Sequence, residues 1–350
     1  MELADLKAPE PVRGIPPWQD PQWLADAEDW IDAQCAQAGL ARSGPARARC
    51  RPYSVVARVP TSAGTVWFKA SPPMSRFEPA LITALAQWHP DIFSTPIAID
   101  LDRAWSLTPD GGPTLREQLA SAGAAGITTL HATVRDYAVL QHDLAQHAGD
   151  LLALGLADLR PASVPAQFAR LLADPAITSR LDTPDGITGD QHQSLLQLRP
   201  QLTEWCAELD GLGIPASLDH ADVHPNNIFA ATGMPFDWGD AALAHPFASL
   251  LVLLRTAAEQ AGLPADAPEI TALTEAYLRP WREAGHPHEA ITRALPLALR
   301  ITPLARALTW GRLFPCYLGH PGPSAHAART LADMLDPAIR HGPQVTHPIE

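Results

Sequence analysis

Polar side chains gather in the stretch LDHADVHPNNIF, residues 218–229. The stretch contributes a carboxylate, an amide and two imidazoles: Asp222, Asn227, His220 and His224. A second stretch, MPFDWGDA, follows directly and adds the carboxylates of Asp237 and Asp240. Carboxylate and amide oxygens are hard ligands that suit Mg²⁺, and a carboxylate beside a hydroxyl can accept or orient its proton. Phosphoryl transfer needs both functions, because phosphate charge must be neutralised and the attacking hydroxyl oriented.

Plainer interpretations of the first stretch exist. Asp222 and Asn227, taken singly, are residue types that favour turns. His220 and His224 are four residues apart, as in zinc-protease helices, but Pro225 follows and no glutamate stands at position 221. The combination of these residues with a carboxylate downstream favours a phosphoryl-transfer site over either alternative.

The order and spacing of these residues resemble the aminoglycoside phosphotransferase and choline kinase-like enzymes. The catalytic loop of those enzymes reads HxDxHPxNI, and residues 220–228 here read HADVHPNNI. An acidic residue before an aromatic one follows in those enzymes, and here the tripeptide FDW provides Asp237. The resemblance implies that Asp222 accepts the proton of the attacking hydroxyl or orients it, and that Asn227 and Asp237 hold magnesium on the phosphates of ATP. It also implies that His220 braces the loop.

The elements expected before this segment form a small α+β unit. Apolar spacing predicts a helix over 21–38 that stops at Gly39. The β-branched and aromatic runs 51–60 and 64–70 flank the turn TSAG and predict a hairpin. A helix over 75–90 and two short strands joined by DLDR are predicted to follow.

Lys69 is unusual because the chain otherwise uses arginine: of 25 basic residues only Lys7 and Lys69 are lysines. The resemblance implies that Lys69, on the third strand, pairs with the ATP phosphates and with Glu78 on the next helix. Two alternatives remain open. Lys69 could protect an edge strand from aggregation, and Glu78 could complete a capping box begun by Ser75.

The segment LTPDGG resembles the hinge of the same enzymes, so backbone groups from Leu107 to Asp110 are expected to bind the adenine edge. Two features depart from the family pattern. The turn PTSAGT has one glycine, Gly64, where protein kinases have a glycine-rich phosphate loop. The segment HPFASL has His245 and Ser249 where family members often have DPxxDL, which leaves open how the catalytic loop is anchored.

After Gly112 the pattern turns mostly helical. Amphipathic spacing predicts helices over 134–155 and near 163–174, 191–210, 245–262, 268–284, 287–314 and 324–340. Apolar pairs alternate with turn residues over 214–241 and predict short strands and loops there. Three roles remain open for Asp240: it could support the residues of the site from behind, contact the substrate, or be the N-cap of a following helix.

The fold class predicted from these elements and the resemblance is α+β, with the two lobes of a protein kinase-like fold. A small, mostly antiparallel β lobe with one helix, which binds nucleotide, is expected over 1–110, and residues 1–20 form a Pro-rich arm. A large, mainly α-helical lobe with the catalytic loop and the acceptor site is expected over 111–350.

Bulk properties exclude several classes of function. The net charge is −13, which argues against a nucleic-acid partner. The four cysteines form no CxxC pair, and the sequence shows neither a signal peptide nor an apolar run long enough to span a membrane. We therefore expect a cytoplasmic protein with no membrane or protein partner evident.

The function predicted is ATP-dependent transfer of the γ-phosphoryl group to a hydroxyl of a small molecule, with ATP and Mg²⁺ as cofactors. The acceptor class stays wide: amino sugar, aminoglycoside, sugar or amino alcohol. The alternative is a kinase-like nucleotide-binding or regulatory protein with little turnover, which the sparse glycines near Gly64 and the missing acidic pair favour.

Overall fold

The computed structural model describes residues 18, 20–51, 54–116, 124–184, 186–317 and 330–335. The chain divides into two compact units, with the boundary between Gly112 and Pro113 and with residues 315–317 grouped with the first unit. The predicted arm over 1–20 and the predicted helix over 324–340 lie largely outside the described residues. The assignment of nucleotide and acceptor functions to residues 1–110 and 111–350 stays a prediction.

The first unit is built on a five-stranded antiparallel sheet of order β1-β2-β3-β5-β4. Its strands are β1 (Arg47–Arg51), β2 (Ser54–Thr61), β3 (Gly64–Ala70), β4 (Ala98–Asp100) and β5 (Trp105–Pro109). β2 and β3 form the predicted hairpin, in which Thr61 pairs with Gly64 and Gly64 takes a φ of 116° that suits glycine. β1 was not predicted, because its sequence RARCR has the exposed charges of an edge strand and no apolar alternation.

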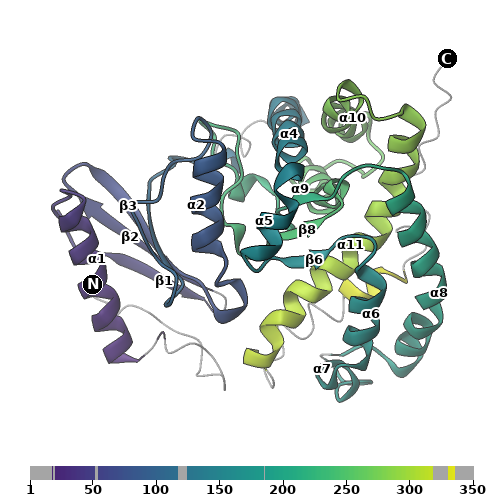
Figure 1. The fold of residues 1–350 in the computed structure, drawn as a ribbon, viewed down its shortest axis with the longest axis horizontal. Helices are drawn as coiled ribbons and strands as arrows, with labels where there is room; N and C mark the ends of the chain where they lie inside the picture. The colour runs from purple at the N-terminus through teal and green to yellow at the C-terminus, as the bar shows by residue number, and fades with distance from the viewer. Residues whose placement is uncertain are drawn as a thin grey trace. The chain divides into compact units, whose positions relative to one another are not determined.

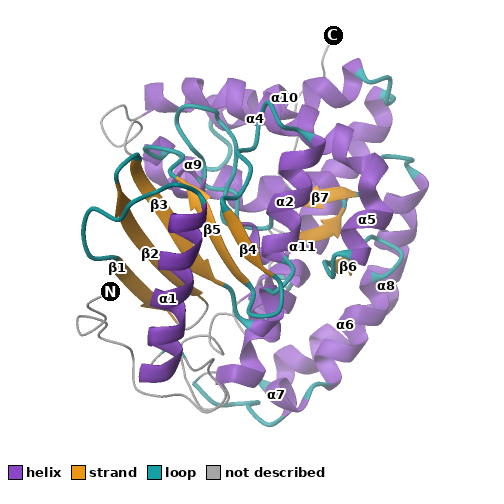
Figure 2. Ribbon diagram, turned by 60° about the vertical axis from the view of Figure 1, so that its left-hand side comes forward, coloured by secondary structure: helices purple, strands orange, loops and turns teal. Residues whose placement is uncertain are grey.

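Two helices cover the opposite faces of this sheet, α1 (Pro21–Gln37) and α2 (Glu78–Trp88) (Figures 1 and 2). Asp20 is the N-cap of α1, where its carboxylate accepts the N–H groups of Gln22 and Trp23, and Gly39 follows the end of the helix with a φ of 71°. Alternate residues of β2, β3 and β5 pack with α1 in one buried core that includes Phe68. The strand period of two therefore turns Lys69 to the other face of the sheet, where α2 lies.

The second unit is mainly helical. Its helices are α4 (Ala124–Leu144), α5 (Ala148–Ala153), α6 (Val164–Ala173), α7 (Pro175–Thr178), α8 (Gly189–Gly211), α9 (Leu250–Ala261), α10 (Pro268–Glu283) and α11 (His288–Tyr317). α4 packs along α10, and α6 packs along α8 (Figure 1). The predicted helices between residues 163 and 314 are confirmed, except that the one predicted over 245–262 begins with the 3₁₀ turn η6 (Pro246–Ser249) ahead of α9. The helix predicted over 134–155 is instead α4, which starts earlier, followed by the short η3 (Ala145–His147) and α5.

A three-stranded sheet of order β6-β8-β7 lies among these helices (Figure 2). It consists of β6 (Ala157–Leu159), β7 (Ser217–Asp219) and β8 (Ala242–Ala244), with β6 parallel and β7 antiparallel to β8. The predicted strands and loops over 214–241 are confirmed as β7 and the 3₁₀ turns η4 (Pro225–Asn227) and η5 (Trp238–Asp240). All three residues of β7 are buried, so this strand is a firm base for the loop that follows it.

None of the helices in the described ranges is both long and apolar enough to cross a membrane.

Candidate active site

The loop predicted to be catalytic, residues 220–228, begins where β7 ends, next to the fully buried carboxylate of Asp219. Asp219 Oδ1 accepts the Ala221 N–H at 3.0 Å and the Ser249 hydroxyl at 2.6 Å. Ala221 takes a φ of 61°, a left-handed conformation that a residue with a Cβ rarely adopts. The bond to Asp219 holds this strained turn, and burial raises the pKa of the Asp219 carboxyl above its ordinary value.

A buried hydrogen-bond network stands behind this turn and ties it to α4 and α10. The Tyr277 hydroxyl bonds to Gln141 Oε1 at 2.5 Å and to the Pro246 carbonyl at 2.8 Å. Gln141 Nε2 donates in turn to the Leu218 carbonyl at 2.8 Å and to Ser249 at 3.1 Å. Ser249 therefore helps to anchor the catalytic loop. Its hydroxyl donates to the Asp219 carboxylate, so the acidic group of this contact is at position 219 and not in the segment HPFASL.

His220 joins the catalytic loop to the segment that carries Asp237. Its Nδ1 accepts the Asp222 N–H at 3.3 Å and its Nε2 lies 2.8 Å from the Phe236 carbonyl oxygen. These partners assign the proton to Nε2, which donates to Phe236. Burial lowers the pKa of His220, so the ring is neutral and acts as a brace, and it packs 4.6 Å from the Trp238 ring.

Asp222 lies at the centre of a set of polar contacts within this unit. Its Oδ1 accepts from Arg306 Nη1 at 2.7 Å, and its Oδ2 lies 3.3 Å from both Asn227 Nδ2 and His224 Nε2. Burial alone would raise the pKa of this carboxyl, but the bond from His224 and the charge of Arg306 outweigh it and hold the pKa well below its usual range. Asp222 is therefore a carboxylate that can orient a hydroxyl.

Asn227 and Asp237 are brought together by backbone pairing. The Phe236 N–H donates to the Asn227 carbonyl at 2.9 Å, and Ile228 forms a β-bridge with Pro235. Asn227 uses Nδ2 toward Asp222, which leaves its hard Oδ1 oxygen without a protein hydrogen bond in the described part of the chain. Asp237 has a φ of 66°, a strained conformation of the kind found at functional turns.

Magnesium fits this donor set. Among the described residues no group of three or more His, Cys, Asp or Glu side chains could hold a metal ion. Mg²⁺ nevertheless requires no such cage, because it commonly takes one or two protein oxygens and completes its shell with phosphates and water. The assignment of Asn227 and Asp237 to magnesium stays a prediction.

His224 and Asp240 were left open by the sequence. His224 caps η4, since its Nδ1 accepts the Asn226 N–H at 3.2 Å while its Nε2 faces Asp222. Asp240 ends η5 and β8 follows it, so it is not the N-cap of a following helix.

The first unit holds Lys69 and Glu78 in an ion pair. Lys69 Nζ lies 2.6 Å from Glu78 Oε1, and the Ser71 hydroxyl donates to Glu78 Oε2 at 2.7 Å. The Glu78 side chain is only 5% exposed, whereas that of Lys69 is 17% exposed. Glu78 is thus fixed on both oxygens and holds the lysine ammonium in place. Phosphate binding by Lys69 stays a prediction.

Both alternatives for this pair are wrong. β3 lies at the centre of the five-stranded sheet, so Lys69 does not protect an edge. α2 starts at Glu78, with Phe77 as an N-cap that lacks a side-chain hydrogen bond, so Glu78 is not the third residue of a capping box.

The predicted hinge residues, Leu107 to Asp110, run from the middle of β5 to the turn that follows it. Leu107 is buried in the sheet, where its carbonyl accepts the Ile97 N–H at 2.8 Å. The Asp110 carboxylate accepts the Trp67 indole N–H and the Gly112 N–H, both at 3.1 Å, and so fixes the turn after the strand. Adenine binding by this segment stays a prediction.

Arg306 is a site residue that the sequence did not indicate. It comes from α11, and its Nη1 donates to the Ala221 carbonyl at 2.6 Å as well as to Asp222. Residues 84 positions apart meet here only because α11 folds back onto the loop. The sole signal would have been a charged residue on an otherwise apolar turn of a long helix, which is weak.

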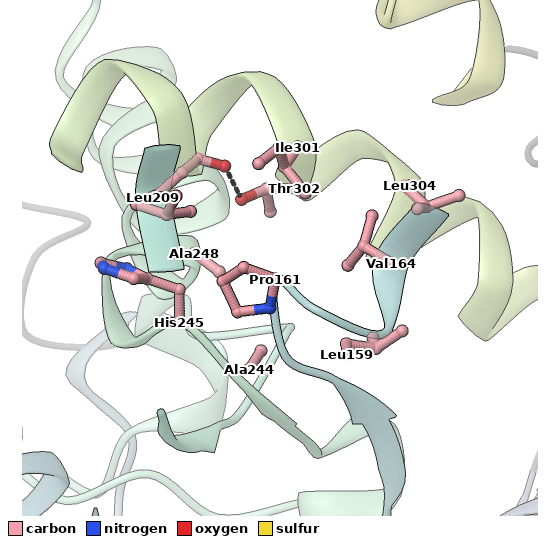
Figure 3. Close-up of a pocket in the computed structure, with 11 residues that line it drawn as sticks. Leu159, Pro161, Val164, Leu209, Ala244, His245, Ala248, Ile301, Thr302 and Leu304 are labelled. Atoms are coloured by element: carbon pink, nitrogen blue, oxygen red, sulfur yellow. Dashed lines mark hydrogen bonds between the residues drawn. The ribbon is translucent and has the colours of Figure 1, made fainter. Parts of the chain in front are cut away.

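A small cavity of about 20 Å³ lies close to the hydrogen-bond network of Tyr277, Gln141 and Ser249. It is lined by His245 together with residues of β6, α6, α8 and α11 (Figure 3). The Nδ1 of His245 accepts the Phe247 N–H at 3.2 Å, while its buried Nε2 has no hydrogen-bond partner among the described residues. The volume suffices for one water molecule. Burial and, to a smaller extent, the nearby His286 lower the pKa of His245 to about 3.

The sequence matches no protein-family model and no curated protein. Solved structures do resemble the fold. The ethanolamine kinase of Plasmodium vivax shares 11% identity with a TM-score of 0.61, covering 92% of this chain and 90% of that one. A choline/ethanolamine kinase family protein of Mesorhizobium loti shares 14% identity with a TM-score of 0.57, covering 91% of this chain and 99% of the other.

An aminoglycoside phosphotransferase of Streptomyces rimosus is also similar, at 18% identity and a TM-score of 0.45 over 81% of this chain and 98% of that one. The predicted resemblance is confirmed at the level of the fold by the two structures with TM-scores above 0.5. The two kinases with the higher TM-scores show that this chain has the fold of the choline and ethanolamine kinases.

Proposed function

We propose that this protein is an ATP-dependent phosphotransferase that moves the γ-phosphoryl group of ATP to a hydroxyl of a small molecule. The observation that carries the proposal is the Asp222–Asn227 pair on a loop braced by His220, in a chain with the fold of choline and ethanolamine kinases. A carboxylate held ionised and an amide with an unused oxygen are the two groups that the reaction requires at one place.

Each residue has a separate role in this proposal. Asp222 orients the acceptor hydroxyl and receives its proton as the new bond to phosphorus forms. Because its pKa is held low, orientation contributes more than basicity. Asn227 Oδ1 and the Asp237 carboxylate would hold Mg²⁺, which when bound neutralises phosphate charge. Lys69, held by Glu78, would bind the α- and β-phosphates.

A coupled assay of ADP release tests the proposal. Wild-type protein with Mg·ATP would be screened over sugars, amino sugars, aminoglycosides and amino alcohols. We expect magnesium-dependent ADP release with at least one acceptor, and a loss of roughly 100- to 10,000-fold in kcat for Asp222→Asn. The exposed substitution Asp136→Asn serves as the matched control and should leave the rate unchanged.

The regulatory alternative predicts another result. A protein that only binds nucleotide would show ATP binding with no acceptor-dependent turnover, and Asp222→Asn would then change nothing in the assay. If the Asp222→Asn variant turned over at the wild-type rate, Asp222 would have no role in the reaction.

A further inference from the structure

The guanidinium of Arg306 lies directly beside the Asp222 carboxylate, which in the proposed function orients the acceptor hydroxyl. Nη1 lies 2.7 Å from Asp222 Oδ1 and 2.6 Å from the Ala221 carbonyl oxygen, so one end of the fork is fixed. The Arg306 side chain is 15% exposed, so it is held by the protein but retains access to solvent.

The other end of the same guanidinium has no hydrogen bond to any described residue. An arginine carries five N–H donors, and those on Nη1 are the ones that contact Asp222 and Ala221. The donors on Nε and Nη2 remain. They belong to a planar group whose orientation is already set, so they are directed donors next to Asp222.

The charge of Arg306 also changes what Asp222 can attract. A site for an ammonium-bearing acceptor needs a carboxylate whose charge is not already compensated, or exposed aromatic faces. The Asp222 carboxylate is compensated by Arg306, and the nearby Trp238 ring is buried against His220. A cationic group next to the reacting hydroxyl would be repelled by the guanidinium.

We infer that Arg306 selects the acceptor. It donates to an oxygen adjacent to the reacting hydroxyl, so the enzyme prefers oxygen-only acceptors, namely sugars, polyols and hydroxy acids, over amino alcohols and amino sugars. This inference rests on the proposed function, because it takes Asp222 as the group that meets the acceptor hydroxyl.

The test compares acceptors of matched size that differ in charge. Glycerol and glycerate are set against ethanolamine and choline, and glucose and gluconate against glucosamine, each with Mg·ATP and ADP release as the readout. For the wild-type protein we expect kcat/KM at least 10-fold higher for oxygen-only acceptors. Either the reverse ranking or equal values would overturn the inference while leaving phosphoryl transfer itself intact.

Two substitutions separate selection from simple support of the loop. Arg306→Gln should lower kcat/KM for oxygen-only acceptors roughly 10- to 100-fold relative to ammonium-bearing ones, mainly through KM. Arg306→Lys keeps the charge without the fork and should lie between Arg306→Gln and wild type. A purely structural arginine would instead lower kcat for every acceptor by one common factor, which contradicts the inference.

The matched control is Arg293→Gln, since Arg293 lies on the same helix but pairs at the surface with Glu208 at 2.5 Å. It should change neither the rate nor the ranking of acceptors. If Arg306→Gln fails to fold, the wild-type ranking and Arg306→Lys still decide. If no acceptor in either panel or in the wider screen supports ADP release, the proposed function fails and the inference falls with it.

Discussion

The two groups assigned to phosphoryl transfer are supported in opposite ways. The Lys69–Glu78 pair joins residues nine positions apart on neighbouring elements, and its further support from Ser71 is equally local. Asp222 depends on partners from distant parts of the second unit: Arg306, Ser249 and Tyr137 act on its loop from α11, the end of η6 and α4. The first site needs only one helix placed on one sheet, whereas the second needs a complete helical core.

This difference predicts different consequences of mutation. Damage to the pair should affect nucleotide binding directly and locally. Damage to the supports of the Asp222 loop should reduce the rate through misplacement, because a displacement of about 1 Å in a catalytic group can lower a rate roughly 100-fold.

Apart from substitution of Asp222 itself, the largest effect is expected for Lys69→Met. It removes the charge that would bind phosphate and leaves the buried Glu78 carboxylate without its cationic partner. We expect kcat/KM for ATP to fall about 100-fold, since a bond to a charged group contributes about 1.5–3 kcal/mol. Thermal unfolding should also occur at a lower temperature. Glu78→Gln is the comparison variant: it keeps the shape of the side chain but has one acceptor oxygen in place of two, so it should weaken ATP binding less than Lys69→Met does. A Lys69→Met enzyme with unchanged KM for ATP would remove the lysine from the nucleotide site.

Asp219 provides the corresponding test on the other side of the comparison. Asp219→Ala removes the acceptor that holds Ala221 and Ser249, so kcat should fall roughly 10- to 100-fold while KM for ATP stays near the wild-type value. Asp219→Asn keeps an acceptor oxygen and should stay within about 3-fold of wild type. Steady-state kinetics of both variants would show whether the turn is held by geometry. An Asn variant as slow as the Ala variant would show that the carboxyl itself is required.

A smaller effect, on stability, is expected for Tyr277→Phe. The change leaves Gln141 Oε1 and the Pro246 carbonyl buried without this donor, at a cost of about 1–3 kcal/mol in the free energy of unfolding. Arg135→Gln, which removes a half-exposed surface pair, should cost no more than a few tenths of a kcal/mol. Urea denaturation of both variants measures the difference, and equal values would mean that the network carries no stability.

At neutral pH the smallest effect is that of His245, whose influence on stability grows only as the pH falls. The pKa of His245 is about 3 in the folded protein, against an ordinary value of 6.5. Between pH 6.5 and pH 3 the imidazole is therefore protonated in the unfolded chain but neutral in the folded protein. The free energy of unfolding should therefore fall as pH falls from about 6.5 toward 3, by at most about 1.4 kcal/mol per pH unit from this group. His245→Asn keeps a side-chain acceptor for the Phe247 N–H and should show a correspondingly shallower slope in denaturation measured at several pH values. If wild type and His245→Asn showed the same pH dependence of the unfolding free energy, the proton taken up on unfolding would bind to a group other than His245.

The local parts of this architecture could be predicted from the sequence. The hairpin around Gly64, the helices with clear amphipathic spacing, and the loop 220–228 carry their signals within one segment. The short strands β6 and β8 could not be predicted, because three residues give too little alternation to detect. β1 was missed because arginines occupy its exposed edge positions.

The supports of the site lie beyond what one sequence can show. Arg306 and Tyr137 reach the catalytic loop across 84 and 83 positions, and nothing in their own segments marks them. The departure at HPFASL raised the question of how the loop is anchored. The answer required knowing that Ser249 meets Asp219, a pairing set by the packing of η6 (Pro246–Ser249) against β7.

The central claim is that nucleotide binding and acceptor activation belong to different residues. The most direct test is the dissociation constant of a non-hydrolysable Mg·ATP analogue, measured by titration calorimetry for wild type, Asp222→Asn and Lys69→Met. We predict that Asp222→Asn binds within about 3-fold of wild type although it has lost turnover, and that Lys69→Met binds at least about 10-fold more weakly. Equal weakening by the two substitutions would contradict the division of roles.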